Sequence, residues 1–149
     1  MNKKILLTLA ILIAALAIIS VACASEPVAV NGNSIKVNGL EFNIPEGFAY
    51  DENDTQAMLR SYNNEFDPNT VVALTNSSHD NIYIFVLNNE ENKSLSDFAN
   101  NYTIEKTIAG KNGVMLDNNF GEIQFIYLDG NKIVLIDADN ENLISSVIK

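Results

Sequence analysis

Short runs of β-branched and aromatic residues, separated by turn-forming residues, recur from residue 34 almost to the end of the chain. Residues 34–44 are the clearest case, because apolar and polar residues alternate on both sides of Asn38-Gly39, a pair that favours a type I′ hairpin turn. Similar runs occupy residues 71–75, 81–87, 103–117, 120–128 and 132–138. Hairpin connections dominate, so the pattern predicts a mainly antiparallel sheet.

Helix signals lie between and after these runs. Residues 94–102 carry the strongest one: Ser94 is a suitable N-cap, Asp97 follows at the third helical position, and Leu95, Phe98 and Tyr102 share one face. Residues 51–66 have looser helical spacing. The C-terminal segment predicts a helix capped by Asp139 or Asn140. We therefore expect an α+β fold, with two or three helices packed on the sheet.

The N-terminus predicts a separate segment. Two lysines precede residues 5–22, which carry no charge, and this run lies between a signal-peptide core of about 7–15 residues and a membrane-spanning helix of about 20. We expect residues 1–24 to be a signal peptide or membrane anchor that contains a hydrophobic leader helix. Residues 25–33 are polar and rich in turn formers, which predicts a tether. Residues 34–149 then form a single α+β domain.

The fate of Cys23 is open among three outcomes. The sequence Ser20-Val-Ala-Cys23 is similar to a lipobox, although serine stands where leucine is usual, and this predicts lipidation of Cys23. Ala22 and Ala24 instead fit signal-peptidase cleavage before Ser25. In the third outcome the apolar run stays as an uncleaved anchor. Each outcome places residues 25–149 outside the cytoplasm, at the cell surface or secreted.

Composition excludes several classes of function. The chain has 19 acidic and 9 basic residues and a net charge of −10, which argues against binding to nucleic acid or to anionic lipid. Cys23 is the single cysteine, so the domain that follows it has no disulfide, thiol nucleophile or cysteine-ligated zinc site. We expect an acidic monomer that meets the membrane through its N-terminal segment or a lipid.

The order of these signals resembles a known group. The hairpin followed by Pro45-Glu46-Gly47-Phe48, the mid-chain helix, the turn at residues 109–113 and the final hairpin with its helix resemble the PsbP/DcrB-like small exported α+β domains. The chain is also similar to uncharacterised secreted, lipoprotein-like proteins of methanogenic archaea. The resemblance covers most of residues 34–149 and implies a binding or accessory role outside the membrane, with no shared catalytic residues.

Few polar residues form a pattern with chemical meaning. His79, the single histidine, precedes Asp80 but has no placed nucleophile, so we expect a solvated loop. Residues 137–142 resemble a calcium loop without its glycine and its final glutamate, which favours an acidic helix start instead. We therefore predict no catalytic residue, metal ligand or cofactor. Among four glycosylation sequons, Asn76 and Asn92 fall in expected loops.

Two functions from different classes fit these observations. The first is an exported, membrane-tethered accessory domain that binds a protein or an envelope ligand without catalysis. The alternative is a small extracellular hydrolase that uses carboxylates, with or without a divalent cation. Its candidate residues are Asp51, Asp54, Asp117 and Asp137.

Overall fold

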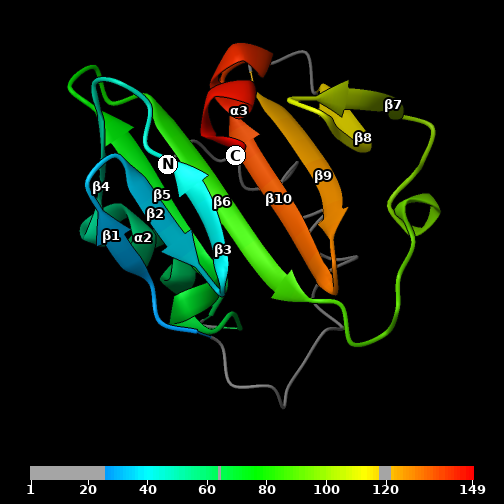
Figure 1. Cartoon of the computed structure of the whole chain (residues 1–149), viewed down its shortest axis with the longest axis horizontal. Helices are drawn as coiled ribbons and strands as arrows, with labels where there is room; N and C mark the ends of the chain where they lie inside the picture. The colour runs from blue at the N-terminus through cyan, green and yellow to red at the C-terminus, as the bar shows by residue number, and fades with distance from the viewer. Residues whose placement is uncertain (1–25, 64, 118–121) are drawn as a thin grey trace.

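The computed structural model describes residues 26–63, 65–117 and 122–149. It contains two antiparallel sheets and two α-helices within these ranges, so the expected α+β class with a mainly antiparallel sheet is confirmed (Figure 1). The small sheet has the order β1-β2-β3 and the large one the order β4-β5-β6-β10-β9-β8-β7. The strands are β1 (Ala29–Asn31), β2 (Ser34–Val37), β3 (Leu40–Asn43), β4 (Phe48–Tyr50), β5 (Val71–Asn76), β6 (Asn81–Asn88), β7 (Thr103–Ile108), β8 (Lys111–Asp117), β9 (Ile123–Asp129) and β10 (Lys132–Ala138).

The predicted first hairpin is confirmed. Strands β2 and β3 pair through Val37 and Leu40, and both turn residues between them have positive φ, 42° at Asn38 and 89° at Gly39. The Asn38 side chain is buried and donates 3.0 Å to the Val86 carbonyl of β6. The turn therefore also joins the small sheet to the large one.

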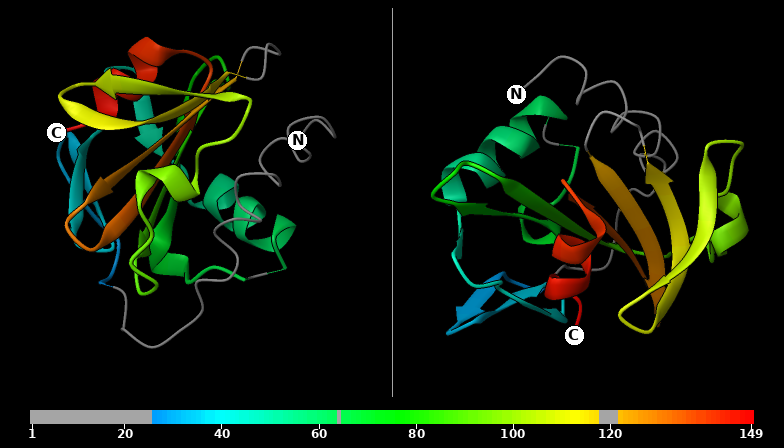
Figure 2. Two further views of the ribbon diagram at one scale, coloured as in Figure 1. Left: turned by 90° about the vertical axis from the view of Figure 1, so that its right-hand side faces the viewer. Right: turned by 90° about the horizontal axis from the view of Figure 1, so that it is seen from above.

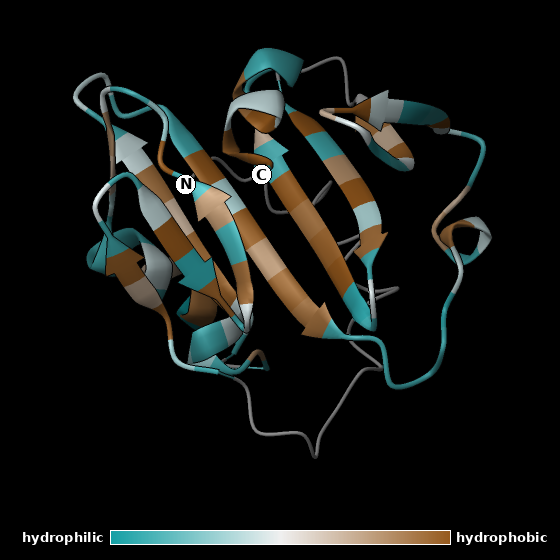
Figure 3. Cartoon of the chain, in the orientation of Figure 1, coloured by the Kyte–Doolittle hydropathy of each residue, from teal (hydrophilic) through white to brown (hydrophobic). Residues whose placement is uncertain are grey.

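The large sheet is covered on both faces. The small sheet and helix α3 (Glu141–Val147) lie on one face, and helix α2 (Glu52–Ser61) lies on the other (Figure 2). Its central strands are apolar along most of their length (Figure 3). In β10, Val134 and Ile136 belong to the core under the small sheet, whereas Ile133 and Leu135 belong to the core under α2. Alternate residues of one strand thus serve two cores.

The helix predictions had mixed outcomes. Residues 51–66 do contain an α-helix, α2, and Asn140 caps α3 by accepting from Leu143 N–H at 3.0 Å. The helix expected over 94–102 was wrong, because only Leu95–Asp97 form a 3₁₀ turn (η2). A second such turn, η1, spans Pro68–Thr70.

Side chains near residue 100 explain the missing helix. The capping box between Ser94 and Asp97 is present, as expected. However, the Asn100 side chain accepts from the Tyr102 N–H at 2.8 Å, and the Asn100 N–H donates to Thr103 Oγ1 at 2.8 Å. These local bonds compete with the helical pattern, and they turn the chain into β7 and leave Tyr102 79 % exposed.

Of the segments expected at the N-terminus, the structure describes only residues 26–33 of the tether. Residues 29–31 of the expected tether form β1, which pairs with β2. Cys23 and the leader lie outside the described residues. Within residues 26–63, 65–117 and 122–149, no helix is long and apolar enough to cross a membrane.

Candidate functional site: an acidic pocket beside α2

A row of directly opposed residues crosses the large sheet on the face that carries α2. Asp137 of β10 lies opposite Tyr83 of β6 on one side and Gln124 of β9 on the other. The row continues to Ala73 of β5 and Leu116 of β8. Three polar side chains therefore stand together at one level of a face that is otherwise apolar core.

Asp137 is the most unusual member of this row. It is 5 % exposed, and Gln124, which is 2 % exposed, donates from Nε2 to its Oδ2 at 2.9 Å. Burial raises the pKa of Asp137 to about 7, and the nearby charges of Glu122 and Asp139 act in the same direction. The hydrogen bond from Gln124 lowers the pKa, but a single neutral donor does not offset the loss of water around the carboxylate.

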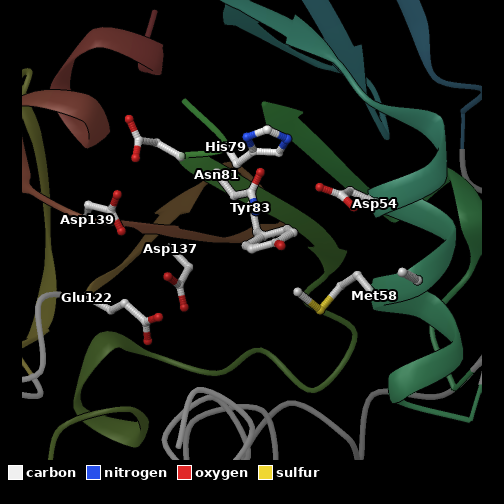
Figure 4. A pocket seen from close by; sticks show the side chains of 10 residues that line it. Asp54, Met58, His79, Asn81, Tyr83, Glu122, Asp137 and Asp139 are labelled. Carbon is white, nitrogen blue, oxygen red and sulfur yellow. The ribbon is translucent and has the colours of Figure 1, made fainter. Parts of the chain in front are cut away.

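Asp137 lines a pocket of about 300 Å³ between α2 and the ends of strands β6 and β10. In Figure 4 the side chains of Asp54 and Met58 enter from α2, and those of Glu122, Asp137 and Asp139 lie across the pocket from them. The remaining lining residues are Ala57, His79, Asp80, Asn81 and Tyr83. Five carboxyl groups and one histidine line the pocket, and none of the described lining residues is lysine or arginine.

The electrostatics of the pocket favour cations. Burial, together with the charges of Asp54 and Asp137, raises the pKa of Tyr83 to about 12. The pKa of Asp139 is also raised, by burial and by Asp80. Burial, the larger cause of both shifts, disfavours charge of either sign, whereas the smaller contribution from the neighbouring carboxylates would favour a positively charged group.

The start of α2 fixes the helical wall of the pocket. Asp51 caps the helix by accepting from the Asp54 N–H at 3.0 Å, and its own N–H donates to the Ala73 carbonyl at 2.9 Å. Thr55 is buried, and its Oγ1 donates to the Asp51 carbonyl and accepts from the Ala73 N–H at 2.9 Å. These bonds hold α2 against β5, so that Asp54 and Met58 face the pocket.

The turn between β5 and β6 forms the rim. The Asn76 side chain accepts from the backbone N–H groups of Ser78 and Asp80, and its amide nitrogen donates to Asp80 Oδ2 at 2.9 Å. His79 sits in this turn with a φ of 66° and is exposed. The histidine is therefore a loop residue, as the sequence indicates, but it also lies at the edge of the pocket.

The structure brings together some of the predicted carboxylates and separates others. Asp54 and Asp137 line one pocket, whereas Asp51 is used as a helix cap. The Asp117 side chain lies outside the described residues. Within the described part of the chain, no three His, Cys, Asp or Glu side chains are grouped so that they could hold a metal ion.

The two glycosylation candidates differ in their surroundings. Asn76 ends β5 and its side chain is bonded within the turn, as described above. Asn92 is exposed in a turn with a φ of 53°. Glycosylation at both positions stays a prediction.

The sequence contained a signal for this site that the interpretation of residues 137–142 as a helix start overlooked. Asp137 follows four apolar residues in a strand that is buried on both faces, so its carboxyl must lie in the interior.

Comparisons with protein-family models, curated proteins and solved structures found no match to this chain.

Proposed function

We propose that this chain is an exported, membrane-tethered domain that binds a ligand in the acidic pocket without transforming it. The observation that carries the proposal is the pocket itself, a hollow of about 300 Å³ with a buried carboxyl group, Asp137, at its wall. Ligand sites are typically concave and carry convergent polar groups that give specificity; this pocket is more polar than most, because five carboxyl groups line it. The resemblance to PsbP/DcrB-like domains and the leader sequence support an accessory role outside the cytoplasm.

A thermal-shift screen of the full chain, kept in a non-ionic detergent, tests this proposal. Small cations, anions and neutral compounds are added singly, because a ligand that binds only the folded state raises Tm. Ala57→Phe fills the pocket from an exposed position on α2, and Ala49→Phe is the matched control on β4.

We expect at least one probe to raise the Tm of the wild type and of Ala49→Phe, and to leave Ala57→Phe unchanged. Equal responses in all three proteins would contradict the proposal, as would no response from any probe. Millimolar Ca²⁺ is expected to have no effect, since no group of three metal-ligating side chains was found in the described ranges.

The hydrolase alternative retains one supporting observation, because Asp54 and Asp137 line the same pocket. Two carboxyl groups that face the same substrate are a common arrangement for acid–base catalysis. Turnover of a peptide, glycan or ester substrate by the wild type, lost in Asp54→Asn and Asp137→Asn, would replace the binding proposal with this one.

A further inference from the structure

The apolar groups of the pocket lie mainly on one side. The side that α2 provides includes Ala57 and the thioether of Met58, which is 1 % exposed, together with the carboxylate of Asp54, and the Tyr83 ring lies next to Met58. Across from them stand Glu122, Asp137 and Asp139 (Figure 4). A ligand that matches both walls has a positive end and a short apolar stem.

A second observation is independent of the number of carboxylates. Asp137 is 5 % exposed, and among the described residues only its Oδ2 accepts a hydrogen bond, from Gln124. Its Oδ1 has no donor within those residues, although the side chain lines the pocket. The Oε1 atom of Gln124, behind it, is also buried without a partner. Buried acceptors without donors are rare in proteins, and Gln124 Oε1 is such an atom within the described residues.

Among the described residues, no lysine or arginine side chain lines the pocket. The ion pairs within the described residues join Lys36, Lys93, Lys106, Lys111 and Lys149 to carboxylates that do not line the pocket. A divalent metal ion is also poorly matched, because Ca²⁺ needs six to eight oxygen ligands and no group of three metal-ligating side chains occurs in this part of the chain. An ammonium group brings three donors and one charge.

We propose that the pocket binds the head of a primary alkylammonium group, which donates to Asp137 Oδ1 while its alkyl stem lies along Met58 and the Tyr83 ring. This inference rests on the proposed function and names its ligand class. The contact of the cation with the aromatic face adds to the attraction. The same group occurs in free amines and in lysine side chains, and the test below separates these two sources.

The test follows the methyl resonances of methionine in the full chain, labelled with ¹³C and kept in non-ionic detergent at pH 8. Met58 lines the pocket, whereas Met115 lies in the core on the other face of the sheet and is the internal reference. Butylammonium and Nα-acetyl-lysinamide are titrated separately, and 1-butanol and Ca²⁺ serve as the neutral and divalent controls.

We expect both ammonium compounds to move the Met58 signal saturably and to leave Met115 in place. Tighter binding of Nα-acetyl-lysinamide would identify a lysine side chain as the better ligand, and tighter binding of butylammonium would identify a free amine. Asp137→Asn should weaken butylammonium binding at least tenfold. Glu90→Gln removes the same charge from an exposed turn outside the pocket and should change the affinity less than twofold.

A Met115 signal at its wild-type position in free Asp137→Asn establishes that the variant is folded, because Met115 lies away from the altered pocket. If it does not fold, Asp139→Asn at the exposed rim replaces it, with an expected loss of twofold to fivefold. Retained affinity in the folded pocket variant would overturn the inference. A Met58 response to 1-butanol or Ca²⁺ but not to ammonium would overturn the ligand class and leave the binding function standing. No response to any probe, here and in the thermal-shift screen, would remove both.

Discussion

At the scale of single residues, the chain shows how one charged side chain can define a site. Strand β10 alternates between two apolar cores, and Asp137 lies on the same face as Leu135, two residues earlier, and Ile133, four residues earlier. An apolar residue there would extend the core. The carboxyl instead has to be removed from water with Gln124 as its hydrogen-bond donor within the described residues, which lowers the free energy of unfolding whenever Asp137 is ionised.

Thr55 contrasts with Asp137, because its buried hydroxyl both donates a hydrogen bond and accepts one. Thr55→Val keeps the shape but leaves the buried Ala73 N–H without its acceptor. We expect the free energy of unfolding to fall by about 1–3 kcal/mol, measured by denaturant unfolding. Thr55→Ser retains the hydroxyl and should recover most of the loss. Thr107→Val, at an exposed site on β7, should change it by less than about 0.5 kcal/mol; equal losses at the two sites would contradict this role for Thr55.

At the scale of elements, the sequence predicted the turns and helix caps that neighbouring residues determine. The Asn38-Gly39 hairpin, the Asn140 cap and the Ser94–Asp97 capping box all form. Reasoning failed where two local signals compete, since the capping box begins a helix that the Asn100 side chain then ends. The order of strands in the sheet could not be predicted from local patterns. Strand β10 pairs with β6, about half the domain away in sequence, and no local pattern specifies that partner.

The same distinction applies to the pocket. Its walls come from α2, from the β5–β6 turn and from the ends of β9 and β10, and only the order of strands in the sheet brings them together. The carboxylates Asp54 and Asp137 could be named from the sequence as candidates. That they share a pocket, and that Tyr83 and Gln124 flank Asp137, follows from the cross-strand register.

At the scale of the whole molecule, we propose that a ligand-binding domain is joined to a membrane tether. Replacing Cys23 by Ser keeps the size of the side chain and its fit to a cleavage site but removes the thiol. If Cys23 is lipidated, we expect the wild type in the membrane fraction and the variant in the medium, because a lipoprotein-type anchor needs its acyl chains. Fractionation with intact-mass analysis measures both.

Two other results would contradict lipidation. A variant that stays in the membrane with an intact N-terminus would show that residues 5–22 are an uncleaved anchor. A wild type already free in the medium and starting at Ser25 would show signal-peptide cleavage. The pocket does not depend on which of these is found, since its described lining residues lie between Asp54 and Asp139.

The central claim is that Asp137 is a buried carboxyl with no lysine or arginine beside it among the described residues that line the pocket, and the pH dependence of stability tests it most directly. The pKa of Asp137 is about 7 in the folded chain against an ordinary value of 3.8, so between these values the folded state holds a proton that the unfolded state has lost. Stability therefore falls as pH rises through this window and is level above it.

The measurement is the free energy of unfolding of the wild type and of Asp137→Asn from pH 4 to pH 8. Relative to the variant, the wild type should lose up to about 4 kcal/mol between pH 4 and pH 7, since each pH unit between the two pKa values contributes about 1.4 kcal/mol. Butylammonium at pH 8 should restore part of that loss in the wild type alone. Parallel curves for the two proteins across the whole range, unaffected by the cation, would contradict the account.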